Sequence, residues 1–382
     1  MACVCAGYLL CPQFITSKLF PRCGRRGTAF CGFTVMGVAL LLYGLGCFIP
    51  DSMKALFVIY SIATRLLEGA GISTTLTAIV SLLTKLFPEE IGLSQSIRFL
   101  GAITGYAIGP VVSAFLIGVL GYFGVFLFFS LAIFFTSLLM FVFEEDASQE
   151  NRDPDALTYW DLFKVRRVSL VMVCGLAPDL LLYSLESTLA LKLRQSFNFP
   201  TSSIGLYFGI FLAGTIIVGS IGMMVPENWD KRKFLIVMLW INVVAPLLIG
   251  PSKVLHLPDE PVMIAVGLAL GGSTRSLMAA YIIAEGVRGG LAKFPQNQER
   301  VGDIVSSAHI IGQGVTLLVC PVIGSSLCKA IGFRSTMDLE ALFFLLNSLL
   351  FSIFTLSDLF NEKKEERQLM SMDEVEEREI KR

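Results

Sequence analysis

The sequence has little charge, and it lacks the motifs by which soluble enzymes hold nucleotides and metals. Only 16% of its 382 residues are charged, whereas about 25% is usual for soluble proteins. No glycine-rich loop that would cradle ATP phosphates is present. The nine cysteines form no Cys-x-x-Cys pair, and the net charge of −1 favours no nucleic-acid partner. We therefore expect no catalytic residues, no cofactor and no metal site.

The hydrophobic residues are concentrated in long runs. They make up 54% of the chain, and the mean hydropathy is +0.71. A helix needs about 20 apolar residues to cross a bilayer. Runs near that length or longer lie at 29–49, 55–84, 95–120, 123–143, 168–191, 203–224, 233–250, 260–285, 303–328 and 339–357. With the shorter apolar start at 1–17, they predict an all-α polytopic membrane protein with about eleven transmembrane helices.

Lysine and arginine are distributed unequally when the predicted loops are assigned to alternate sides of the membrane. The loops on the side of 18–26 hold sixteen of them, and the opposite loops hold six. Cytoplasmic loops are the ones enriched in these residues. We therefore expect the 18–26 loop and the charged C-terminal tail, 361–382, to be cytoplasmic.

A polar stretch, 144–167, separates two halves that resemble each other. Residues 108–124 read IGPVVSAFLIGVLGYFG, and residues 319–335 read VCPVIGSSLCKAIGFRS. When the two segments are aligned, Pro110 falls on Pro321. An internal repeat around a cytoplasmic linker is typical of a secondary transporter.

The same spacing relates Gly121 to Gly332. The repeat therefore predicts two pseudo-repeated helical bundles. We divide the chain into an N-terminal bundle, a cytoplasmic linker, a C-terminal bundle and a charged tail, at residues 1–143, 144–167, 168–360 and 361–382.

Two features of the N-terminal half stand out inside apolar runs. Arg65 and Glu68 each cost roughly 2.5–3.5 kcal/mol on insertion scales. They are one helical turn apart and able to pair, either as part of coupling or as a static structural contact. The next run carries Gly101, Gly105 and Gly109 at four-residue spacing, which predicts a smooth face against which another helix packs closely.

Three motifs, in order, make the sequence resemble the major facilitator superfamily of membrane transporters. The family's loop motif G-x-x-x-D-R-x-G-R-R corresponds to residues 17–26, with Ser17 and Pro21 as departures and the glycine and arginines in place. The motif R-x-x-Q-G-x-G is matched by Arg65, Glu68, Gly69 and Gly71. The antiporter motif G-x-x-x-G-P-x-x-G is matched by Gly105, Gly109, Pro110 and, as a departure, Ser113. The resemblance implies the major facilitator fold.

The sequence is more closely similar to the vesicular amine transporter branch, with its polyamine-transporting relatives. Leu185–Leu189 reads LESTL, like that branch's span-7 stretch L-E-P-T-L, and Asp303 matches its span-11 aspartate. The branch's span-10 acid falls near Thr274 and Arg275, which weakens a monoamine assignment. The resemblance begins at the family's second span, so we expect an incomplete chain or one that lacks that first helix.

The resemblance implies proton-coupled antiport of organic cations by alternating access. The candidate coupling and substrate residues are Glu186, Asp303, Arg65 and Glu68. The candidate gating residues are Gly24, Arg25, Arg26, Gly105, Gly109, Pro110, Pro321 and Gly324.

Simpler structural readings compete with these roles. Glu186 would then only bond a neighbouring helix, Asp303 would cap a helix or lie at the interface, and the basic loop residues would only set topology. His309 is either a proton relay, since histidine titrates near neutral pH, or a satisfied helix contact. Asp179 either faces the cavity or has a buried partner.

Two other functions remain open at this point. One is a major facilitator carrier for another solute, including an organic anion recognised by Arg275. The other is a degenerate, non-transporting membrane sensor or scaffold. We expect a monomer in a vesicle, vacuole or plasma membrane, with protons and a small organic cation as partners.

Overall fold

The computed structural model describes residues 2–142, 157–226 and 229–380, and this part of the chain is helical without strands. The helices are α1 (Ala2–Phe14), α2 (Phe20–Leu45), α3 (Lys54–Leu86), α4 (Ile91–Leu139), α5 (Tyr159–Phe163), α6 (Arg166–Cys174), α7 (Ala177–Phe197), α8 (Thr201–Gly222), α9 (Lys231–Ile249), α10 (Pro261–Leu291), α11 (Gln298–Ile331) and α12 (Phe333–Ile380). Short turns are η1 (Ile15–Leu19), η2 (Gly46–Phe48), η3 (Asp51–Met53) and η4 (Met140–Val142).

Nine helical segments of the described chain are long and apolar enough to cross a membrane. Two of them, Val4–Phe48 and Ile91–Val142, contain a break at a glycine with positive φ. Gly24 has φ 68° and ψ 175°, and Gly121 has φ 68° and ψ −178°. Only glycine adopts this conformation without strain. Each break separates two predicted spans, so these segments agree with about eleven predicted helices.

The predicted internal repeat reappears in the backbone. Gly332, the repeat partner of Gly121, ends α11 with φ 83° and ψ 157°, so both glycines end a long helix in the same region of φ/ψ space. Pro110 lies inside α4, and Pro321 lies inside α11. The two motifs therefore build the same local structure in both halves.

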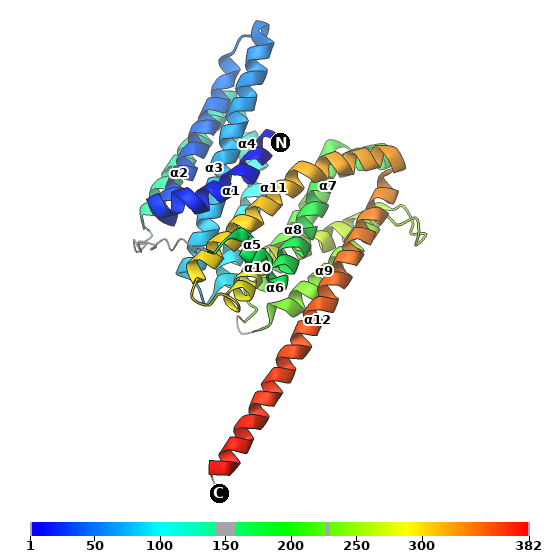
Figure 1. Cartoon of the computed structure of the whole chain (residues 1–382). Helices are drawn as coiled ribbons and strands as arrows, with labels where there is room; N and C mark the ends of the chain where they lie inside the picture. Colours follow the sequence, from blue (N-terminus) through cyan, green and yellow to red (C-terminus); the bar gives the residue numbers. More distant parts are fainter. Residues whose placement is uncertain (1, 143–156, 227–228, 381–382) are drawn as a thin grey trace.

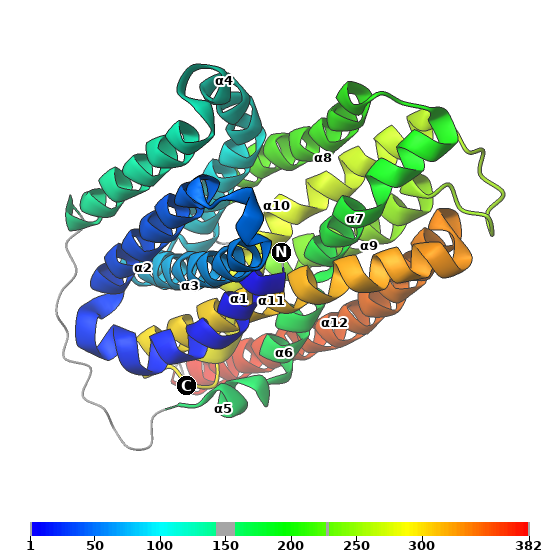
Figure 2. The ribbon, with the colours of Figure 1, turned by 90° about the horizontal axis from the view of Figure 1, so that it is seen from above.

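The helices form two bundles that diverge toward one end of the molecule (Figures 1 and 2). Helices α1–α4 form the N-terminal bundle and α6–α12 the C-terminal bundle, while α12 projects beyond the other helices (Figure 1). Most of the predicted linker, residues 143–156, lies outside the described residues. Its end forms α5, which begins with a capping box between Thr158 and Asp161.

The C-terminal bundle has the larger apolar core, and both bundles contain helices that approach closely at glycines. The C-terminal bundle has a continuous apolar core around α10, which is buried almost without interruption from Thr274 to Gly290. In the N-terminal bundle, helices approach one another at glycines. The backbone nitrogen of Met36 lies 2.6 Å from where a Cβ of Gly71 would be, so no larger residue fits there without a shift.

The bundles meet through α1 and α3 against α11, and through α4 against α8 and α10. Phe99 and Ile103 of α4 pack with Leu212 and Ile216 of α8 and with Ala279 of α10. This apolar contact joins the first part of α4 to the second half of α8.

The glycine face of α4 behaves differently from the sequence prediction. Nothing lies within 4 Å of a Cβ built at Gly101, Gly105 or Gly109, and the same holds for Gly205 and Gly209 of α8. The predicted close approach of another helix is therefore wrong for this conformation. The reason is the divergence of the bundles, because α4 and α8 meet around Phe99 and separate further along.

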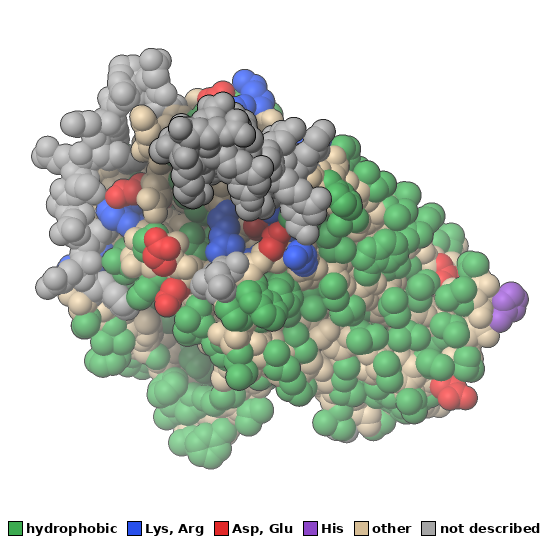
Figure 3. Space-filling view, turned by 90° about the horizontal axis from the view of Figure 1, so that it is seen from below, with side chains coloured by type: hydrophobic (Ala, Val, Ile, Leu, Met, Phe, Trp, Pro, Cys, Tyr) green, Lys and Arg blue, Asp and Glu red, His purple; other side chains and the backbone are tan. Residues whose placement is uncertain are grey.

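The surface matches a membrane protein. Large apolar side chains are exposed along the outward faces of the helices, with Phe115 at 72% and Phe135 at 65%. Figure 3, seen from below, shows mainly hydrophobic flanks, while most of the Lys, Arg, Asp and Glu side chains gather in one region and a few acidic ones lie at the other end. A lipid environment accounts for such flanks, because apolar side chains there need no burial against protein.

Candidate functional site

A buried ion pair lies at the centre of the molecule, between α7 and α10. The Arg275 Nε donates to Asp179 Oδ1 at 2.9 Å, and the amide of Gln313 on α11 donates to Asp179 Oδ2 at 3.1 Å. Both charged residues are buried, at 6% and 4% exposure. The Arg275 guanidinium lies 5.1 Å from the ring centre of Phe99 on α4. The pair therefore joins three helices of one bundle and touches the other bundle.

Glu186 follows Asp179 by seven residues on α7, which is close to two helical turns, so both lie on the same face. Arg275 bonds to Asp179 on this face. Glu186 is exposed and within electrostatic range of Arg275. In the described part of the chain, no hydrogen bond or ion pair joins it to another residue. The local arrangement is thus a neutralised pair beside one unpaired carboxylate.

His309 of α11 lies in the same region, within electrostatic range of Asp179 and Arg275. It is 2% exposed, and neither ring nitrogen has a hydrogen-bond partner among the described protein atoms. The structure therefore does not show the satisfied helix contact, and a role of His309 in proton movement stays a prediction.

Asp303, the second predicted coupling acid, lies elsewhere. Arg25 of α2 donates to both of its carboxylate oxygens, at 2.9 Å from Nε to Oδ1 and 2.8 Å from Nη2 to Oδ2. The Ser81 hydroxyl of α3 also donates to it. The Asp303 side chain is 1% exposed and that of Arg25 is 7%. Asp303 is thus a fully bonded link between the two bundles.

The link extends to a third and a fourth charged group. Arg25 Nη1 lies 3.1 Å from Glu299 Oε2, and Lys85 Nζ lies 3.2 Å from Glu299 Oε1. The neighbouring Arg26 instead stacks on Phe141, with 4.9 Å between its guanidinium and the ring centre. We call Arg25, Ser81, Lys85, Glu299 and Asp303 the charged link.

Arg65 and Glu68 form the pair that their spacing predicts, with 2.6 Å between Nη1 and Oε2. The Arg65 guanidinium also lies 3.9 Å from the ring centre of Tyr43. Both contacts stay within the N-terminal bundle, and neither residue belongs to the site around Glu186.

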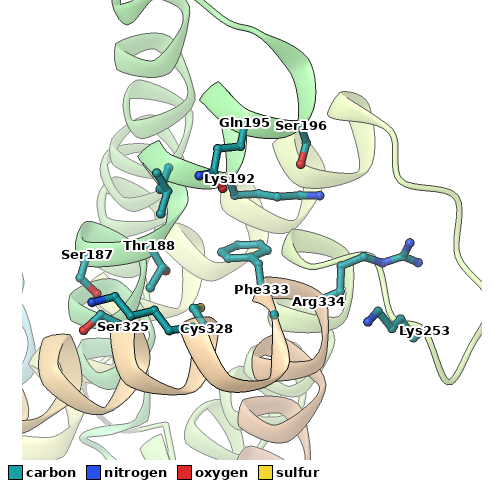
Figure 4. Close-up of a pocket in the computed structure, with 13 residues that line it drawn as sticks. Ser187, Thr188, Lys192, Gln195, Ser196, Lys253, Ser325, Cys328, Phe333 and Arg334 are labelled. Carbon is teal, nitrogen blue, oxygen red and sulfur yellow. The ribbon is translucent and has the colours of Figure 1, made fainter.

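A cavity of about 540 Å³ lies at the far ends of α7 and α11. Figure 4 shows Lys192 coming from α7, Lys253 from the α9–α10 loop and Arg334 from the start of α12. Lys329 also lines the cavity. Lys192 Nζ pairs with Asp259 Oδ2 at 2.6 Å. The other charges make no ion pair with described residues, so we call this space the basic cavity.

The sequence did not reveal two of these contacts. Asp179 and Arg275 were each recognised, but their pairing was not, and the only signal for it was that opposite charges stood alone in apolar spans. Glu340 of α12 was missed. It is 9% exposed and bonded to the hydroxyl of Ser184 on α7. Among the described residues, no group of His, Cys, Asp and Glu has the arrangement of a metal site.

Comparisons with known proteins agree with this architecture. The family model described as Major Facilitator Superfamily matches residues 1–291. A Mus musculus protein described as "MFS-type transporter SLC18B1" is 22% identical over 349 residues, which are 91% of this chain and 75% of that protein.

Two solved structures share the fold. The human organic anion transporter MFSD10 (TETRAN) has a TM-score of 0.66 at 17% identity, over 92% of this chain and 82% of that one. A bacterial homologue of the iron transporter ferroportin, in an outward-facing state, has a TM-score of 0.69 at 15% identity, over 92% and 88%.

Proposed function

The chain belongs to the Major Facilitator Superfamily, and from this premise we propose that it exchanges protons for organic cations by alternating access. The family makes it a multi-pass membrane transporter of a small molecule and not an enzyme, as the sequence motifs predicted. The resemblance to that family and the predicted fold are confirmed.

Glu186 is the observation on which the exchange of protons for cations rests. It is an exposed carboxylate without an ion-pair partner in the described chain, in the middle of an apolar helix. A bare charge there is costly, so either a proton or a cationic substrate neutralises it. Because the two compete for one carboxylate, binding of one releases the other, which is the requirement for antiport.

The Asp179–Arg275 pair supports this role by keeping Glu186 the free acid of the site. Arg275 is already engaged by Asp179, so the pair has little net charge. The Phe99 ring on Arg275 belongs to the opposite bundle. A relative movement of the bundles therefore changes the surroundings of the ion pair and of Glu186 together.

The charged link supports alternating access. It holds α2 and α3 against α11 at one end of the molecule, while α4 and α8 stay apart at the other. The lysine and arginine bias places the linked end on the cytoplasmic side. We assign Asp303 and Arg25 to closing that side, in a state open to the opposite side, with the C-terminus cytoplasmic.

An organic anion is the second candidate substrate, and the basic cavity favours it. Lys253 and Lys329 carry charges without an ion-pair partner in the described chain, next to Arg334 at the mouth of the C-terminal bundle. Such a cluster raises the local concentration of anions. Competition of uptake by organic anions, but not by amines, would select this alternative.

Uptake into proteoliposomes tests the proposal. An imposed proton gradient should drive accumulation of labelled amines or polyamines, and a protonophore should abolish it. Glu186→Gln should lose this uptake, whereas Glu260→Gln, the same change in an exposed loop, should keep it.

Two outcomes would count against this assignment. Full gradient-driven uptake by Glu186→Gln would remove Glu186 from coupling. No uptake of any cation or anion would favour a non-transporting sensor or scaffold. Location in a vesicle, vacuole or plasma membrane and a monomeric state remain part of the same proposal, and fractionation and light scattering test them.

A further inference from the structure

A buried carboxyl that the proposed exchange does not use lies where α12 packs against α7, at Ser184, two residues before Glu186. Glu340 of α12 is 9% exposed and receives a hydrogen bond from the Ser184 hydroxyl at Oε1. Its other oxygen, Oε2, has no hydrogen-bond partner among the described protein atoms, and no ion pair with described residues involves it. Burying a carboxylate that has one hydrogen bond and no neighbouring cation is so costly that the group keeps its proton instead. The position therefore suits a ligand that supplies a positive charge.

Glu340 lies at the wall of a cavity of about 400 Å³ between α7, α11 and α12. This volume lies within the range of small-molecule sites. Nearly all other lining groups are apolar, among them Ile323 of α11 and Phe343 and Leu346 of α12. These three side chains are 51%, 52% and 60% exposed. In helices that cross a membrane, such exposure means that the cavity opens toward lipid.

We propose that this cavity binds a lipophilic amine, a single basic nitrogen on an apolar body, which enters from the membrane. The apolar walls take the body, and Glu340 takes the nitrogen. A neutral amine dissolved in the bilayer accepts the carboxyl proton, so that an N–H bond forms as the O–H bond breaks. The resulting ammonium and carboxylate remain paired, and no other reactant is needed.

The neighbouring basic cavity argues for entry from lipid rather than from water. Thr188 and Cys328 line it, and each lies four residues, or one turn, beyond Ser184 and Gly324 of the carboxyl cavity. An amine that approached along this axis would pass lysine and arginine side chains that repel its charge. The apolar rim toward the membrane carries no such barrier.

Gly324 of α11 allows α7 to approach closely enough to place Ser184 against Glu340. A Cβ built there would lie 2.8 Å from the Ser184 hydroxyl oxygen. The absence of a side chain therefore lets α7 come close to α11, which places Ser184 against Glu340. This contact holds the carboxyl with Oε1 bonded and Oε2 without a partner among the described protein atoms.

Dodecylamine is the probe for this site, with dodecanol as its uncharged match. Full-length protein in lipid nanodiscs is titrated with each, and the shift in Tm gives the apparent affinity. We expect stabilisation by dodecylamine and a weakening of about tenfold to hundredfold in Glu340→Gln, as for loss of a charge-assisted hydrogen bond. Glu260→Gln, the same change in an exposed loop, should bind like the wild type.

A second variant keeps the test decisive if Glu340→Gln does not fold. Ile323→Trp retains the carboxyl but fills the cavity, and it should also lose dodecylamine binding. Unchanged binding in either variant overturns the proposal, as does equal stabilisation by dodecanol. Loss of binding in Glu186→Gln instead would place the amine between the bundles. Because no proton gradient is used, failure here is separate from failure of the antiport proposal.

Discussion

The interface between the bundles has charged residues at one end and glycines at the other. At one end, Arg25 and Asp303 join α2 to α11 through buried, charge-assisted hydrogen bonds. At the other, Gly109 of α4 and Gly209 of α8 have nothing within 4 Å of the point where a Cβ would lie. Charged contacts have a defined geometry and are either made or broken, whereas small residues let helices approach without a fixed partner.

This difference suggests how one interface opens while the other closes. Breaking the charged link exposes its carboxylates to water, which offsets the lost contacts. Closing the glycine faces buries apolar surface and needs no ion to be desolvated. Opening one end is therefore offset by hydration of charged groups, and closing the other is favoured by burial of apolar surface. Substitutions at the two ends should have different effects on stability and transport.

The largest effect is expected from Arg25→Met. It leaves Asp303 buried without its cation, and breaking a buried pair on one side costs about 3–5 kcal/mol. Thermal unfolding in detergent should show a marked fall in Tm. Arg22→Met is the matched control, because Arg22 is exposed and forms no hydrogen bond or ion pair with described residues, and surface substitutions change stability by about 0.5 kcal/mol at most.

A double variant sharpens this test. Arg25→Met combined with Asp303→Asn removes both charges and should recover much of the lost stability. An unchanged Tm in Arg25→Met alone would mean that the charged link does not stabilise this conformation.

Gly109→Leu is expected to lower uptake without lowering Tm. The residue has open space around it here, so Tm should stay near the wild-type value. In the opposite state the leucine would overpack the closed α4–α8 contact by about 1–3 kcal/mol, and uptake should fall by about fivefold to hundredfold.

Gly118→Leu is the control for this change. Gly118 also has open space, but it lies nine residues further along α4, on the opposite helix face. Equal loss of uptake in both variants would show that the glycine face is not the closing surface.

The smallest effect on stability is expected from Glu186→Gln. Because this carboxylate is exposed and forms no hydrogen bond or ion pair in the described chain, its neutralisation should change the free energy of unfolding by no more than about 0.5 kcal/mol. Asp303→Asn should cost clearly more. If chemical unfolding shows a larger loss of stability for Glu186→Gln than for Asp303→Asn, the assignment of Glu186 to transport and Asp303 to structure is wrong.

Local contacts were predictable, and distant ones were not. The Arg65–Glu68 pair follows from a spacing of one helical turn, and Gly121 and Gly332 follow from the repeat. The Arg25–Asp303 contact joins residues 278 positions apart, and Arg275–Asp179 joins residues 96 apart. No helical period connects such residues, so only the packing of the bundles pairs them.

The sequence by itself determined that this protein crosses a membrane many times, because its apolar runs have the length of a bilayer and its backbone must satisfy its own hydrogen bonds there. Its motifs also determined the family. The tertiary structure alone decided the partners of the acids that have no cation one helical turn away. Glu186 and Asp303 both lie in membrane-spanning helices, but neighbouring helices bring a cation only to Asp303, and that depends on how the two bundles pack.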